Sequence, residues 1–255
     1  MAAALILPPA VVAAGSGASA APAVSSARLA AAATDISVTG SDVSTWPAFS
    51  PTISRYAIAN GPAADGAVTV DVAAPAGSSV LVNGAPATGP TTVSGLEVGD
   101  EVSVIVKDGS ESAAYAFIYL PKSFPELTAT VPEQPGRQPG LVGLTLNRFG
   151  QQAVDFEAVV DGNGVPAHAI ASTLGVLDLK VQPNGSYTAQ RLTNTPGRTG
   201  GALVEMDETF TEIKRFETAG LVNTDGHDSI LRPDGSVVLI AYEFDAGAGV
   251  ADDVV

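Results

Sequence analysis

The residues best suited to chemistry lie in one short segment, Thr224-Asp225-Gly226-His227-Asp228. An imidazole gains or loses its charge near neutral pH, and a neighbouring carboxylate can orient the ring. His227 and Asp228 are therefore the candidate catalytic residues, with His227 as nucleophile or general acid and base. A purely structural histidine is the alternative interpretation.

Arginine side chains are the candidates for binding an anionic substrate, because a guanidinium group matches the geometry of an oxyanion. Arg198 stands in a glycine-rich loop and is the predicted substrate-binding residue, whereas Arg232 precedes a Pro-Asp-Gly turn and is expected to be solvated. The second histidine, His168, is interpreted as a surface or strand residue.

The composition excludes several kinds of site and partner. The chain has 255 residues, no cysteine, two histidines and a net charge of −15. Thiolate or polyhistidine metal centres are excluded, and an acidic protein repels nucleic acid. No phosphate-binding loop or dinucleotide fingerprint occurs. We therefore expect no metal, no cofactor, no nucleic acid and no membrane span.

The N-terminal part of the chain divides into two segments. Residues 1–34 are alanine-rich; the stretch Ala2–Ala14 is apolar and passes into small residues, which is typical of an export signal that is cleaved near Ala20 to Ala23. No Lys or Arg comes directly after Met1, so the positively charged start of such a signal is missing. A low-complexity alanine tail is therefore the alternative. We expect an exported protein, secreted or on the cell surface.

Residues 35–121 are predicted to form an immunoglobulin-like β-sandwich. Apolar residues alternate with polar ones in short runs, and Gly, Pro and Asn turn signals separate the runs. The predicted strands are Asp35–Thr39, Ile53–Ile58, Ala67–Val72, Ser79–Val82, Glu101–Val106 and Ala114–Leu120. Tight turns are expected at Asn60-Gly61-Pro62, Asn83-Gly84 and Asp108-Gly109, which tolerate positive φ.

After a proline-rich linker, residues 122–139, the chain repeats itself. The segment Asp178–Ser186 aligns without gaps with Asp228–Ser236, and each predicts a strand, a Pro-Asx-Gly turn and a second strand. A further pair, Ala158–Val165 and Leu203–Phe210, predicts two Asp-led hairpins. Two hairpins in 45–50 residues are typical of one β-propeller blade, with a second sandwich as the alternative.

Two resemblances extend this interpretation. Residues 35–121 resemble the cadherin-like β-sandwich domain of bacterial secreted and surface proteins, through Ser37–Gly40, Trp46–Pro51, Arg55–Ile58, Val80–Gly84 and Tyr115–Ile118. No acidic cluster for Ca²⁺ accompanies them. Residues 140–255 resemble the bacterial arylsulfotransferase (arylsulfate sulfotransferase) β-propeller, through Pro139–Thr145, Val160–Pro166, Leu177–Gly185, Asn194–Arg198, Leu203–Asp207 and Asp225–Gly235.

The second resemblance implies a function. Members of that family have a six-bladed propeller and move sulfate from a phenolic sulfate donor to a phenol acceptor through a sulfohistidine, without the nucleotide donor PAPS. It places His227 and Asp228 in the family's His-Asp blade motif, facing the channel. The 116 residues after Pro139 supply little more than two blades, so we expect a truncated propeller that is inactive by itself. The alternative is a non-catalytic surface or adhesion module that binds carbohydrate or protein.

Overall fold

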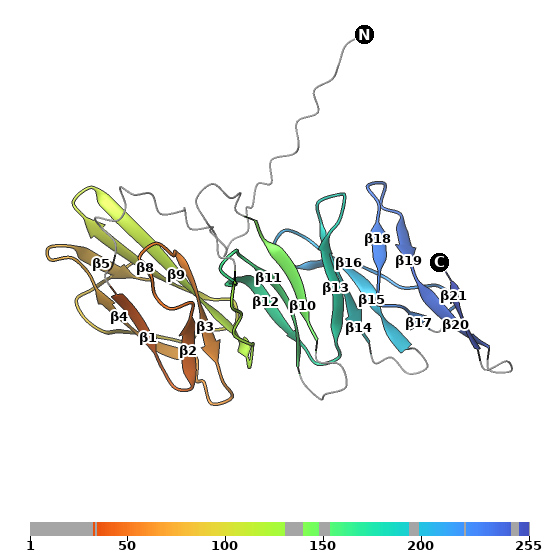
Figure 1. Cartoon of the computed structure of the whole chain (residues 1–255), viewed down its shortest axis with the longest axis horizontal. Coiled ribbons are helices and arrows are strands. Elements are labelled where there is room, and N and C mark those ends of the chain that lie inside the picture. The colour runs from red at the N-terminus through yellow and green to blue at the C-terminus, as the bar shows by residue number, and fades with distance from the viewer. Residues whose placement is uncertain are drawn as a thin grey trace, which may run out of the picture.

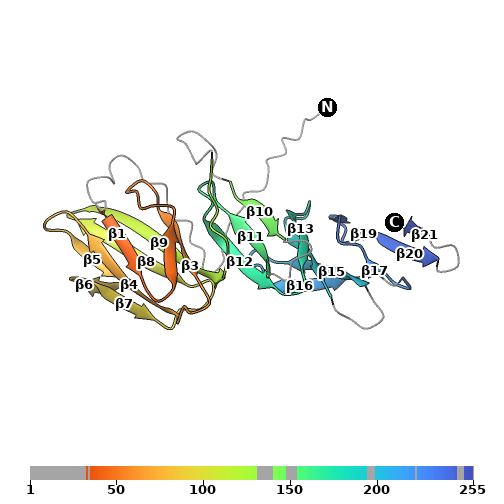
Figure 2. The same cartoon turned by 60° about the horizontal axis from the view of Figure 1, so that its bottom comes forward.

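All regular structure in the described part of the chain is β-strand. The computed structural model describes residues 33, 35–130, 140–147, 154–193, 199–221, 223–245 and 250–254. The predicted all-β class is therefore confirmed. The two sheets built from residues 35–122 lie together at one end of the long axis, and the later sheets follow in chain order toward the other end, as Figures 1 and 2 show. Of the predicted export signal, only Ala33 is described.

The strands β1–β9 form an N-terminal unit of two sheets. The three-stranded sheet has the order β1 (Asp35–Thr39), β4 (Ala67–Ala73), β7 (Thr91–Ser94). The six-stranded sheet has the order β2 (Val43–Trp46), β3 (Arg55–Asn60), β9 (Glu111–Lys122), β8 (Glu101–Asp108), β5 (Ser79–Val82), β6 (Ala85–Ala87). Strands β3 and β9 pair in parallel, and the other pairs are antiparallel.

The two sheets share one hydrophobic core. Alternate residues Val102, Val104 and Val106 of β8 are fully buried, as the period of a strand requires. The core is completed by stacked aromatic rings, and Tyr56 donates its hydroxyl to the Ser50 carbonyl oxygen at 2.6 Å. All six predicted strands occur within a few residues of their predicted bounds.

The strands β2, β6 and β7 were not predicted from the sequence. They are three or four residues long, and most of their side chains are exposed or half-buried, so their hydrophobic pattern is weak. The Asn83-Gly84 turn is confirmed as the β5–β6 hairpin. Both residues have positive φ, 47° and 77°, which suits Asn and Gly.

Residues beyond 140 form smaller antiparallel sheets. The first C-terminal sheet has the order β10 (Val142–Leu146), β11 (Asp155–Val160), β12 (Pro166–Ser172). The second C-terminal sheet is a meander of β13 (Val176–Val181), β14 (Tyr187–Leu192), β15 (Thr199–Met206), β16 (Glu212–Phe216), with the short β17 (Asn223–Thr224) parallel to β15. Two hairpins follow, β18 (Ser229–Leu231) with β19 (Val237–Leu239), and β20 (Ala241–Asp245) with β21 (Val250–Val254).

The sequence repeat at an offset of 50 residues is confirmed in the turns. In the β13–β14 hairpin, Asn184 Oδ1 accepts hydrogen bonds from the Ser186 N–H and hydroxyl at 3.1 and 2.8 Å. In the β18–β19 hairpin, Asp234 Oδ1 accepts the same two bonds from Ser236 at 2.9 and 2.7 Å. The glycines that follow these Asx residues have φ of 88° and 81°. The two hairpins thus close with one geometry.

The first C-terminal sheet is covered on both faces. One face contributes Phe156, Ala158 and Val160 to a core shared with the N-terminal unit. The N-terminal unit supplies Trp46, Ala57, Ile118, Leu120 and Phe124 to that core. The opposite face carries Glu157 and His168 toward the second C-terminal sheet, where they meet Arg191 and Phe210. The described sheets form a stack, and they do not close into a ring.

Candidate functional site

The candidate site lies in the connection from β17 to β18. The Asp225 N–H donates to the Ile240 carbonyl oxygen at 2.7 Å, which anchors the start of the connection. At Gly226 an added Cβ would lie 2.9 Å from Leu177 Cδ1, so a side chain there would push into the second C-terminal sheet. The glycine therefore allows the backbone to pass close to β13 before His227 turns outward.

Asp225 holds the imidazole of His227. Nδ1 of the ring lies 2.8 and 3.0 Å from the two carboxylate oxygens of Asp225, and the His227 N–H donates to Oδ1 at 2.9 Å. The side chain of Asp225 is 8% exposed and that of His227 is 77% exposed. A carboxylate at Nδ1 selects the tautomer with its proton on Nδ1. Nε2 of neutral His227 therefore carries the free lone pair.

Asp228 points to a different partner. Lys180 Nζ lies 2.5 Å from Asp228 Oδ1 and 2.8 Å from Asp178 Oδ2, so the ammonium joins β13 to the start of β18. The hydrogen bond from Lys180 and one from the Ser229 N–H hold the pKa of the Asp228 carboxyl below its usual value. Burial acts to lower the pKa of Lys180, but the two carboxylates together raise it.

Asp178 occupies a strained position in this cluster. Its φ is 53°, and the pairing of β13 with β14 shifts register between Leu177 and Lys180. Burial raises the pKa of its carboxyl, against the opposing effect of Lys180. The bulge turns Asp178 toward Ser229, whose hydroxyl donates to Oδ2 at 3.3 Å. The repeat aligns Asp178 with Asp228, so one lysine binds equivalent carboxylates of two successive repeats.

His227 and Asp228 are neighbours in one connection, but each side chain contacts a different partner. Asp225, which lies two residues before the histidine, is the carboxylate that orients the ring. The repeat offset indicated that Asp178 and Asp228 occupy equivalent positions. Nothing in the sequence indicated that Lys180 would bind them both. Arg198 lies outside the described residues. Arg232 is an exposed turn residue, as predicted.

His168 lies on strand β12, as predicted, but its ring is packed inside the molecule. The ring stacks on Phe210 with centroids 3.9 Å apart and planes inclined by 11°. Its Nε2 is buried and has no hydrogen-bond partner among the described residues. Burial, together with the positive charge of Arg191, lowers the pKa of His168 to about 4. The ring is therefore neutral at physiological pH, and of the two interpretations, surface or strand, the strand is the one that the structure shows.

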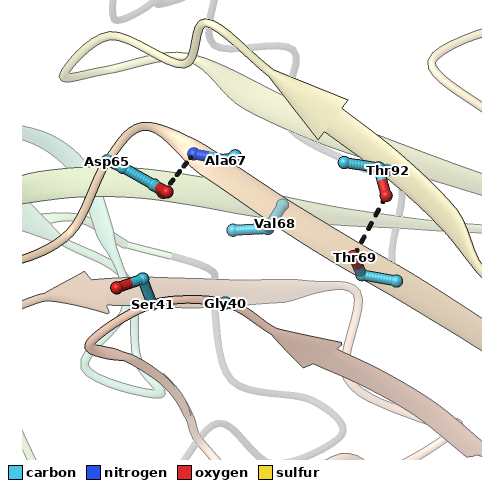
Figure 3. Close-up of a pocket in the computed structure, with 7 residues that line it drawn as sticks. All are labelled: Gly40, Ser41, Asp65, Ala67, Val68, Thr69 and Thr92. Atoms are coloured by element: carbon cyan, nitrogen blue, oxygen red, sulfur yellow. Dashed lines mark hydrogen bonds between the residues drawn. The ribbon is translucent and has the colours of Figure 1, made fainter.

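A shallow cavity of about 190 Å³ lies on the three-stranded sheet of the N-terminal unit, far in sequence from His227 (Figure 3). Its walls carry small and hydroxyl-bearing residues, and Thr69 and Thr92 hydrogen-bond to each other at 3.1 Å. Asp65 is its one charged lining residue, and its carboxylate accepts the Ala67 N–H at 3.2 Å. These groups satisfy one another and offer no nucleophile with a base.

The described residues contain no group of three or more His, Asp and Glu side chains placed to hold a metal ion. They also contain no helix that could cross a membrane. The site offers an exposed imidazole that Asp225 orients and, at the neighbouring Asp228, a lysine that two carboxylates hold. Comparison with known proteins found no protein-family model and no curated protein that matches this chain.

Proposed function

We propose that this chain is an exported arylsulfate sulfotransferase-like protein that moves sulfuryl groups between phenolic compounds through His227, without PAPS. The observation that carries the proposal is the imidazole with Nδ1 bound by buried Asp225 and Nε2 facing outward. The motif resemblance of residues 225–235 supplies the substrate class.

In the proposed reaction, Nε2 of neutral His227 attacks the sulfur of an aryl sulfate. The N–S bond forms as the S–O bond to the ring breaks, and the phenolate leaves with the bonding electron pair. The sulfated imidazolium keeps its proton on Nδ1, where the Asp225 carboxylate stabilises the positive charge. A second phenol then attacks sulfur through its oxygen, and the S–O bond forms as the N–S bond breaks and returns its electron pair to Nε2 of neutral His227. The proton of the second phenol passes through solvent to the phenolate that left. Lys180, whose ammonium binds Asp228, is the candidate for attracting the sulfuryl oxygens.

We propose further that the N-terminal unit is a cadherin-like β-sandwich and that the C-terminal sheets are successive propeller blades. The shared core of the two N-terminal sheets supports the first assignment. The meander β13–β16 and the repeated hairpin turns support the second, because a blade is a four-stranded antiparallel sheet.

The test measures phenol release from a nitrophenyl sulfate ester with and without a phenolic acceptor. It uses a form of the protein that carries a complete ring of blades, because the blades within residues 140–255 are expected to be inactive by themselves. We expect acceptor-dependent release that His227→Ala abolishes. Asp225→Asn should lower the rate about 100-fold, since it loses the charge that favours the Nδ1–H tautomer. Asp228→Asn, the matched control, should have a much smaller effect because Asp228 binds Lys180.

Nitrogen NMR of His227 separates a positioning role of Asp225 from a structural one. The wild-type ring should show the proton on Nδ1, and Asp225→Asn should shift the tautomer population while the rest of the spectrum is retained. Equal losses in Asp225→Asn and Asp228→Asn, or no acceptor-dependent release by the folded wild-type protein, would contradict the proposal.

The second candidate function is a non-catalytic surface module that binds carbohydrate or protein. Two observations favour it. His227 is 77% exposed, whereas catalytic groups usually lie in a cleft that excludes water. Lys180 is already paired with two carboxylates, Asp178 and Asp228, and Asp225 at His227 is a third, so the negative charges of the cluster outnumber its one ammonium and repel an anionic donor. A folded protein that fails the sulfate assay supports this alternative.

A further inference from the structure

A second cavity, separate from the His227 cluster, lies where the first and second C-terminal sheets meet. Its volume is about 500 Å³, within the range of about 300–1,000 Å³ that is typical of small-molecule sites. The turn from β12 to β13 forms one wall, and the ends of β14 and β16 form the other. The lining residues are Ala171, Ser172, Thr173, Leu174, Arg191, Leu192, Thr193 and Arg215.

Both arginines of this groove are held in place by carboxylates. Arg191 donates from Nε and Nη2 to the buried Glu157, at 3.2 and 3.4 Å. Arg215 donates from Nε and Nη2 to Glu212, at 3.0 Å each. These bonds leave Nη1 of each guanidinium without a hydrogen bond among the described residues, and Arg191 Nη1 lies 3.7 Å from Glu212. The donors are therefore fixed before any ligand arrives.

The charge balance decides which ligand fits. Two guanidinium groups face two paired carboxylates, and a third carboxylate, Glu217, acts on Arg215 electrostatically. The groove therefore has no net positive charge with which to attract sulfate, phosphate or a carboxylate. The hydroxyls of Thr173 and Thr193 form no hydrogen bond within the described part of the chain, and Leu174 and Leu192 offer apolar surface.

We infer that this groove binds a neutral carbohydrate. Neighbouring sugar hydroxyls donate and accept hydrogen bonds at once, which matches guanidinium donors beside a carboxylate and free threonine hydroxyls. The apolar face of a sugar ring can contact the leucines. This inference goes beyond the sulfuryl transfer at His227 and does not depend on it, because the groove and the histidine share no residue.

The test applies the purified protein to a glycan array that holds neutral oligosaccharides of glucose, galactose, mannose and N-acetylglucosamine, together with sulfated and carboxylated glycans. We expect retention of at least one neutral oligosaccharide. Arg215→Gln should weaken its binding about tenfold or more, because it removes a charged donor and releases Glu212. Arg215 is 40% exposed, so the variant should fold, which circular dichroism checks.

Arg232→Gln is the matched control, since it makes the same charge change at an exposed turn outside the groove. It should bind as the wild type does. Three outcomes would overturn the inference: no neutral glycan bound by the folded wild-type protein, binding that Arg215→Gln leaves unchanged, or binding of anionic glycans alone. None of these outcomes bears on the phenol-release assay, so the two proposals fail independently.

Discussion

At the scale of single residues, His168 shows how burial sets a charge state. Its ring lies between the two C-terminal sheets against Phe210, where a charged imidazole would lose hydration without gaining a partner. The pKa of about 4 lies below the value of 6.5 that the unfolded chain has. Between these values the unfolded chain binds a proton that the folded chain does not. Stability should therefore be complete above pH 6.5 and fall as the pH drops toward 4.

His168→Phe should remove this pH dependence while keeping the stacked ring. The pH dependence of stability that comes from Glu157 has the opposite sign. Burial raises the pKa of its carboxyl, so the stability that Glu157 contributes falls as the pH rises. The difference between the two proteins isolates the histidine. Between pH 7 and 4, we expect the wild type to lose about 1–3 kcal/mol more free energy of unfolding than His168→Phe. Denaturation curves at several pH values measure this, and parallel pH profiles would show that His168 does not titrate as a buried group.

At the scale of the elements, the repeated hairpins depend on glycines in the left-handed region. Gly185 and Gly235 have φ near +85°, and an added Cβ would meet no atom within 4 Å at either position. Replacing either with alanine therefore tests backbone strain without a steric clash. We expect Gly185→Ala and Gly235→Ala to destabilise the protein equally, by about 1–2 kcal/mol each.

Gly140→Ala provides the control for these turns. That glycine also has open space around its added Cβ, but it lacks a positive φ, so its substitution should be neutral or slightly stabilising. Midpoints of urea unfolding compare the three variants. A loss of stability in Gly140→Ala as large as in the turn variants would show that backbone strain is not the cause.

At the scale of the whole molecule, the N-terminal unit and the first C-terminal sheet share a core. Trp46, the one tryptophan of the chain, stacks on Phe124 with ring centroids 6.4 Å apart, and Phe124 meets Phe156 edge-on at 5.0 Å. The indole therefore reports on this interface. Each sheet of a propeller contacts a neighbouring blade on both faces, but here the N-terminal unit covers one face of the first C-terminal sheet. A propeller ring that closed through that face would have to displace the N-terminal unit from it.

Phe156→Ala should loosen this junction. Phe156 is 4% exposed, and removing a buried phenyl ring costs about 3–5 kcal/mol. We expect the emission of Trp46 to shift to longer wavelength at a lower temperature than in the wild type. Phe216→Ala, at a half-buried position in β16 outside this core, should leave the Trp46 transition unchanged. A Trp46 transition that Phe156→Ala does not move would mean that the two units unfold separately.

The strands and turns followed from local patterns. Alternating apolar residues predicted β1, β3 and β5, and the Asn83-Gly84 and Pro-Asx-Gly signals predicted hairpins, because the period of a strand and a positive φ depend on neighbours in the chain. The β13–β14 and β18–β19 hairpins followed from the aligned repeat for the same reason. Short strands such as β6, with exposed faces, have too little pattern to be predicted.

Long-range contacts could be decided only by the tertiary structure. Motif spacing made Asp228 the expected partner of His227, but Lys180, 48 residues earlier, binds Asp228 and leaves Asp225 to orient the ring. His168 looked like an ordinary strand residue until Phe210, from the neighbouring sheet, covered it. The strand pattern of residues 155–160 likewise does not say what their apolar face contacts. The pairing of a charge and the burial of a ring depend on which distant elements pack together, and a local sequence pattern carries no record of that packing.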